Sequence, residues 1–204
     1  MAQKPQSRRP VESRPIENAK EIELLASPTR IEIVDTLESL GGEASVAELA
    51  AQLGRPADGL YYHLRQLAEG GLLIETATPE GRRYRTRVPE GERLRLRYKP
   101  GRNANAQAVG DVAASVLRVA GRDFKRAISD PGAVAEGPLR ELWAARNKGW
   151  VGDSELAEIN RLLMRINTLL HRPRTTSRNR LVALSWILAP VDAKPARREA
   201  GAKR

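Results

Sequence analysis

Helix start and stop signals follow one another closely between residues 27 and 71, and they constrain the fold more than any other feature of this 204-residue chain. The first start signal is Ser27-Pro28, which places serine at the N-cap and proline at the first helical position, where its missing N–H costs no hydrogen bond. Gly41-Gly42 ends this predicted helix. Apolar residues recur between the two signals at three-residue steps: Ile31, Val34, Leu37 and Leu40.

Two further helices are predicted directly after the first. Ser45 and Glu48 form a capping-box pattern, in which each side chain accepts a hydrogen bond from the other residue's backbone N–H, and Gly54 ends this short helix. Pro56 fits the first turn of a third helix, which stops at Gly70-Gly71. The third helix has a single apolar stripe, formed by Leu60, Leu64 and Leu67.

A β-hairpin is expected after the third helix. Residues 72–77 are predicted to form a strand, 78–81 (TPEG) a turn with Pro and Gly where type I turns prefer them, and 82–88 the returning strand. Helix, short helix, closely coupled helix and hairpin is the order of a winged helix-turn-helix domain, which we place at residues 20–88. The expected fold class is α+β, mainly α, with this N-terminal domain followed by a small helical domain containing a short β-sheet.

The run from residue 25 to 87 resembles the ArsR-type winged-helix transcriptional regulators. The resemblance rests on five motifs: SPTR at 27–30, SVAELA at 45–50, YHLRQL at 62–67, GLL at 71–73 and GRRY at 81–84. It implies a homodimeric regulator that places its third helix in the DNA major groove and its wing over the flanking backbone. Many members of that family sense metals, but this chain has no cysteine and only two distant histidines, so no metal site is predicted.

The outward face of the third predicted helix is the first candidate surface for DNA. At 100° per residue, Tyr62, Arg65 and Gln66 lie opposite the leucine stripe, and the arginine and glutamine suit the hydrogen-bonding edges of bases. An ordinary solvated face is the alternative. His63 flanks the stripe, and we interpret it as packing rather than contacting phosphate. The residues assigned to DNA binding on or beside this helix are Ser45, Arg55, Asp58, Tyr61, Tyr62, His63, Arg65 and Gln66.

The arginines of the hairpin are the second candidate surface. Arg83, Arg85 and Arg87 point to one face of the returning strand, because side chains alternate along a strand. Arginine suits phosphate contacts, which position a protein on DNA without specifying the sequence. A solubilising edge strand is the alternative. Arg82, Arg83 and Arg85 complete the predicted DNA-binding set.

Residues 89–189 are predicted to form a small α+β domain for dimerisation or for sensing an effector. The strict alternation at 92–99 (ERLRLRYK) predicts a half-buried strand, and its expected partner is the apolar run 180–189. Trp143, Trp150 and Trp186 either line a pocket or belong to the core, and the core is the preferred interpretation.

Helices are also expected in this second half, at about 109–124, briefly at 139–143, and at 156–170. The apolar residues of the last one are spaced by three, four, three and four positions, which is typical of a helix-pairing seam. An intramolecular core has the same spacing, so both interpretations stay open. The seam consists of Leu156, Ile159, Leu163, Ile166 and Leu170.

Charge and composition limit the function. The net charge of +10 suggests an anionic partner, yet residues 21–88 carry 7 basic and 11 acidic side chains, and most of the positive excess lies near the two ends. Segments 1–19 and 190–204 are expected to be disordered basic tails. The absence of cysteine excludes disulfides. We find no secretory signal or membrane-length apolar run, and therefore expect a cytoplasmic protein with no membrane partner.

The sequence as a whole predicts a transcription regulator that binds specific double-stranded DNA as a homodimer. A small-molecule effector stays open. The chain has no phosphate-binding glycine loop, nucleophile motif or His–carboxylate cluster, so neither an enzyme nor a cofactor is expected. The alternative function is a protein-interaction module that uses the winged helix as a scaffold, which the acidic character of the domain keeps open.

Overall fold

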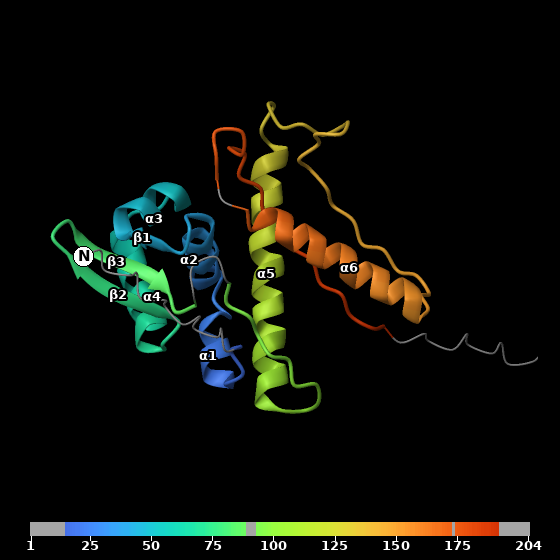
Figure 1. Cartoon of the computed structure of the whole chain (residues 1–204), viewed down its shortest axis with the longest axis horizontal. Coiled ribbons are helices and arrows are strands. Elements are labelled where there is room, and N and C mark those ends of the chain that lie inside the picture. Colours follow the sequence, from blue (N-terminus) through green and yellow to red (C-terminus); the bar gives the residue numbers. More distant parts are fainter. Residues whose placement is uncertain (1–14, 89–92, 173, 192–204) are drawn as a thin grey trace, which may run out of the picture.

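The computed structural model describes residues 15–88, 93–172 and 174–191. Figure 1 shows α1 to α4 and the β2–β3 hairpin on one side of the long helix α5, with α6 extending away on the other. Most of the two predicted tails, 1–14 and 192–204, lies outside the described residues. The elements in chain order are α1 (Ala19–Leu24), α2 (Pro28–Ser39), β1 (Glu43–Ser45), α3 (Val46–Leu53), α4 (Asp58–Glu69), β2 (Leu73–Thr78), β3 (Gly81–Thr86), α5 (Ala104–Ile128) and α6 (Asp153–Leu170).

The three helices predicted from caps and stripes are α2, α3 and α4. The capping box at the start of α3 is present: the Glu48 amide donates to Ser45 Oγ at 3.2 Å, and the Ser45 amide donates to Glu48 Oε2 at 2.7 Å. Gly54 ends α3 with a φ of +62°, a left-handed conformation that glycine adopts without strain. Local sequence signals therefore fix the helix-turn-helix geometry.

A three-stranded antiparallel sheet, in the order β1-β3-β2, completes the domain. The hairpin forms where expected, with Thr78 paired with Gly81 at its tip. β1 was not predicted, and its central residue Ala44 pairs with Tyr84. Tyr84 and Thr86 are buried and Arg85 is exposed, which confirms the predicted alternation of the returning strand.

The buried core extends beyond residue 88 into α5. Ala108, Val112 and Ser115 are buried against α1 and α2, and the Ser115 hydroxyl donates to the Ala26 carbonyl at 2.5 Å. Ile16 is also buried, so ordered structure begins inside the segment expected to be a disordered tail. The first half of α5, up to Ser115, thus belongs to the core of the N-terminal domain.

The predicted sheet of the second half is absent from the residues that the structure describes. Within 93–99 only Leu96 forms a bridge, parallel to Ile16, and the Ile16 amide donates to the Arg95 carbonyl at 2.7 Å. Residues 180–189 have no regular secondary structure, and their large apolar side chains are exposed. The expectation was wrong because Leu94 and Leu96 pack on the N-terminal core, which leaves the 180–189 run without its assumed partner.

The helices of the second half match the sequence only in part. α5 and α6 form as predicted, but 139–143 has no helix, and the Arg140 guanidinium lies 3.7 Å from the Trp143 ring centre. All three tryptophans are exposed, Trp150 by 92%, so they form neither core nor pocket. No residue of α6 is buried. No described helix is both long and apolar enough to cross a membrane.

Candidate DNA-binding surface

Helix α4 presents the first predicted surface. Leu60, Leu64 and Leu67 are buried, which fixes the rotation of the helix and turns its other face outward. Asp58, Tyr61, Tyr62 and Arg65 are exposed on that outer face. Gln66 is half-buried and donates to Glu69 Oε2 at 3.2 Å. The exposed face thus combines two phenol rings with one guanidinium.

Ser45 and Arg55 lie at the two ends of α3, and both already have partners within the chain. The Ser45 hydroxyl caps α3 through Glu48. Arg55 follows the end of α3 and donates to Thr29 Oγ1 at 3.0 Å and to Glu32 Oε2 at 2.7 Å. Ser45 therefore has a structural role of its own, and Arg55 is held against α2.

His63 lies on the flank of α4 and is half-buried, in line with packing. Its Nδ1 atom is buried without a hydrogen-bond partner among the described residues, and its ring meets Tyr62 edge-on at 5.4 Å between ring centres. Burial lowers the pKa of His63, and the charges of Arg30 and Arg55 lower it further. The imidazole is therefore neutral at physiological pH, in a positive local field.

The arginines of the wing are less available for contacts with DNA than the sequence implied. Arg82 pairs with Glu75 at 3.0 Å, and Arg83 pairs with Glu43 at 2.7 Å. Arg83 also reaches Glu48 of α3 at 3.3 Å. Of the predicted wing set, only the Arg85 side chain is exposed with no ion pair or hydrogen bond to a described residue, while its backbone pairs within the sheet. The cationic edge expected on β3 is therefore largely neutralised by acidic neighbours.

Ion pairs occupy most of the basic side chains of residues 21–88. Four of their seven basic side chains have an acidic partner: Arg55, Arg82, Arg83 and Arg87. Arg30 donates to the backbone carbonyls of Leu24 and Glu23. Arg65 and Arg85 are left as the exposed cations that no described carboxylate neutralises. Two positive charges on α4 and the wing thus stand out from a net-negative domain.

Sequence reasoning missed the partners of Arg55. Glu32 lies on α2 with its side chain only 14% exposed, and Arg122 of α5 donates to the same carboxylate with both terminal nitrogens. No periodicity marks Glu32, and Arg122 is 90 residues away along the chain. The sequence does not show which carboxylates are buried, so this network can be recognised only from the structure.

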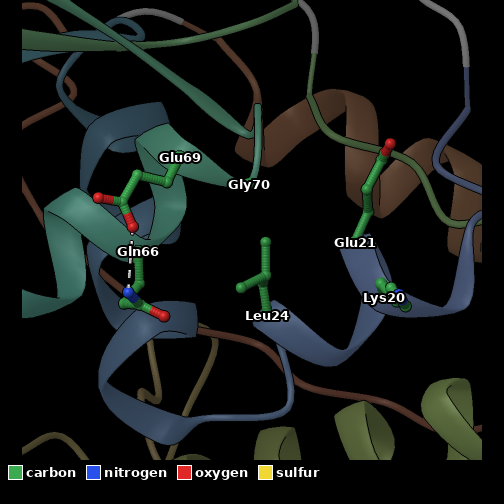
Figure 2. Close-up of a pocket in the computed structure, with 6 residues that line it drawn as sticks. All are labelled: Lys20, Glu21, Leu24, Gln66, Glu69 and Gly70. Carbon is green, nitrogen blue, oxygen red and sulfur yellow. Dashed lines mark hydrogen bonds between the residues drawn. The ribbon is translucent and has the colours of Figure 1, made fainter.

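One pocket of about 310 Å³ opens between α1 and the end of α4. Figure 2 shows Leu24 pointing toward Gly70, with Lys20 and Glu21 from α1 and Glu69 from α4 around it. A Cβ atom on Gly70 would overlap Leu24 Cδ1, so glycine permits this close approach. None of the tryptophans lines the pocket, and no cluster of three potential metal ligands occurs in the described parts of the chain.

Comparison with known proteins agrees with this geometry. A family model described as a helix-turn-helix domain matches residues 25–76, from the end of α1 into β2. That family includes ArsR-type regulators, and the match covers about a quarter of the chain. No curated protein matches. The match indicates a DNA-binding regulator in general terms.

Proposed function

We propose that this protein is an ArsR-like transcription regulator that binds specific sequences in double-stranded DNA. The observation that carries the proposal is the outer face of α4, where Tyr62 and Arg65 are exposed on a helix whose opposite face is locked into the core. A rigid helix with such a face fits the major groove, and an arginine there can donate two hydrogen bonds to guanine.

The wing has a different part in this proposal. Arg85 binds the DNA backbone, while Arg82 and Arg83, which are paired with acidic side chains, contribute less than the sequence alone implied. Backbone contacts set the position of α4 but carry no sequence information. The protein acts where its DNA is, in the cytoplasm, and the proposal includes no catalysis, cofactor or metal.

A binding titration that compares a duplex carrying the protein's target sequence with a random duplex tests the proposal. Arg65→Ala and Tyr62→Ala should weaken binding to the target more than binding to the random duplex, since base contacts give about 1–3 kcal/mol of discrimination. Arg85→Ala should weaken both equally and reduce the salt slope by about one unit. Arg126→Ala on α5, whose side chain is 80% exposed, is the matched control for loss of one exposed arginine.

We further propose that the active form is a homodimer held together by the second half. Support comes from α6, whose apolar seam has no buried residue within its own chain. Two recognition helices related by a two-fold axis would read half-sites roughly 34 Å apart. In sedimentation, the full chain should be a dimer, and a chain ending at residue 128 should be a monomer. A full chain that is monomeric at micromolar concentration would contradict this proposal.

A protein-interaction module is the second candidate, favoured by the exposed apolar run 181–188. Large exposed apolar patches mark interfaces with other molecules. Salt dependence separates the two functions, because phosphate contacts release counterions and make DNA affinity fall steeply with salt. Binding to random duplex that is weak and hardly changes with salt would favour the interaction module.

A further inference from the structure

The hydrogen bonds of the Arg55 side chain all go to residues of α2. Its two terminal nitrogens donate to Thr29 and Glu32, which lie one turn apart on α2. A guanidinium has five N–H donors, so three remain after these two bonds. The side chain is 32% exposed, and two residues separate Arg55 from the start of α4. Arg55 is therefore oriented by α2 and still able to bind an anion beside the start of α4.

The carboxylate that holds Arg55 is shared with α5. Glu32 accepts hydrogen bonds from both Arg55 and Arg122, and Arg122 also contacts Asp123 at 3.2 Å. Arg122 is thus shared between Glu32 and Asp123, and the two arginines and two carboxylates form one linked network between the end of α3, α2 and α5. The lowered pKa of His63, to which Arg55 and Arg30 contribute, is consistent with a positive field at this place.

We propose that Glu32 and Arg122 are positioning residues for Arg55, which binds one DNA phosphate at the start of α4. Glu32 fixes the plane of the Arg55 guanidinium, and Arg122 holds the Glu32 carboxylate in place by donating to both of its oxygens. Helix α5 thereby supports DNA binding without touching DNA. The inference rests on the proposed DNA binding but is independent of the base contacts made by α4.

The test measures binding of the full chain to a random duplex at several salt concentrations. Arg55→Ala should weaken binding by more than about tenfold, as loss of one charge-assisted hydrogen bond implies, and should reduce the salt slope by about 0.9. Glu32→Gln should weaken binding and reduce the slope in the same way, although it makes the chain more positive. General charge effects alone predict tighter binding for this variant, so the sign separates the two explanations.

The role of Arg122 is tested by replacing it in chains with and without Arg55. Arg122→Ala should weaken binding severalfold, Arg122→Lys should restore it, and neither change should matter in the Arg55→Ala background, because the effect passes through Arg55. Arg126→Ala, one turn further along α5 and 80% exposed, is the matched control and should leave affinity nearly unchanged. Arg122 is itself 45% exposed, so its replacement should not prevent folding.

Three outcomes would overturn the inference. Tighter binding by Glu32→Gln would show that Glu32 competes with DNA for Arg55 instead of positioning it. An Arg122→Ala effect that persists without Arg55 would show a direct contact between Arg122 and DNA. If the wild-type chain does not bind duplex DNA at all, the proposed function fails together with the inference, whereas the first two outcomes leave that function intact.

Discussion

Similar apolar stripes are buried in the part of the chain up to the end of α5 and exposed in the part after it. In α4, the stripe Leu60, Leu64 and Leu67 is completely buried by α2, α3 and the sheet. In α6, an apolar stripe of equal regularity has no buried member, and the large apolar side chains of 181–188 are exposed. The periodicity of a stripe therefore predicts a helix but not the surface that covers it.

The difference follows from where the partners of each stripe come from. The first region supplies its own partners within about one hundred residues, including α5, which packs on α1 and α2. The second region has one isolated helix and two extended segments around it (Figure 1). Because burial of apolar surface is the main favourable term in folding, the second region lacks the intramolecular contacts that stabilise the first.

Truncating the chain before α5 should destabilise the first region strongly. A chain ending at residue 88 loses Val112 and Ala108, which cover α1 and α2, and exposes apolar core. We expect it to unfold at much lower denaturant concentration than a chain ending at residue 128. The shorter chain should lose several kcal/mol, since each buried aliphatic side chain contributes about 1.5–3 kcal/mol.

Circular dichroism during urea titration makes this measurement, with the full chain as the control. The chain ending at residue 128 should unfold at nearly the same midpoint as the full chain, because the residues after α5 contribute little to the first core. Equal midpoints for the chains ending at 88 and 128 would show that α5 is not part of the first folding unit.

Removing one leucine from α4 should cost more stability than removing one from α6. Leu64→Ala should lower the free energy of unfolding by about 3 kcal/mol, because it deletes a fully buried side chain and leaves a cavity. Leu169→Ala on α6 removes a side chain that is 42% exposed, and should lower it by less than about 1 kcal/mol. Comparable losses for the two variants would mean that α6 is as well buried in solution as α4.

The sequence predicted the first region well because its signals are local. The capping box at Ser45, the stop at Gly54 and the hairpin turn each depend on residues within a few positions of one another, and the structure contains all three. Strand alternation likewise placed Tyr84 inward and Arg85 outward. Local rules sufficed wherever the deciding contacts were short-range.

The remaining features depend on contacts between distant residues, which leave no period in the sequence. The pairing of Arg83 with Glu43 joins residues 40 positions apart, and it neutralises an arginine that strand alternation alone presented as free. The Leu96 bridge to Ile16 replaced the expected pairing of 92–99 with 180–189. In the first case the pattern gave the correct side of the strand but not the partner of its arginine. In the second it placed Leu94 and Leu96 correctly toward a core, whereas Tyr98 is 69% exposed.

A buried carboxylate should give the first region an unusual pH dependence. Glu38 of α2 is 6% exposed, accepts a hydrogen bond from the Leu94 amide at 3.0 Å, and pairs with Arg93 at 3.2 Å. Burial raises the pKa of Glu38 to about 7, against its ordinary value of 4.5. The folded state thus binds more protons than the unfolded state between these values, so this group makes stability fall as pH rises from 4.5 through 7.

Glu38→Gln should remove that contribution, which is at most about 3 kcal/mol over the interval. Urea unfolding at pH 5 and pH 8 should show the wild type losing more stability than the variant between the two pH values. Glu158→Gln is the control from the second region, since the hydrogen bond from Arg161 lowers the pKa of this exposed carboxylate more than burial raises it. A wild-type pH dependence identical to that of Glu38→Gln would contradict the assignment.

The smallest expected effects come from one ion pair in each region. Arg87 pairs with Glu21 at 3.0 Å and ties the end of the hairpin to α1, with both side chains about 70% buried. Arg87→Ala should lower Tm by about 2 °C, as expected for a partly buried pair worth ~0.5–1 kcal/mol. Arg161 pairs with Glu158 at 2.5 Å but within one exposed helix, so Arg161→Ala should leave the Tm unchanged. Differential scanning calorimetry at low protein concentration compares the two variants, and a larger Tm loss for Arg161→Ala would show that α6 belongs to the cooperative unit of the first region.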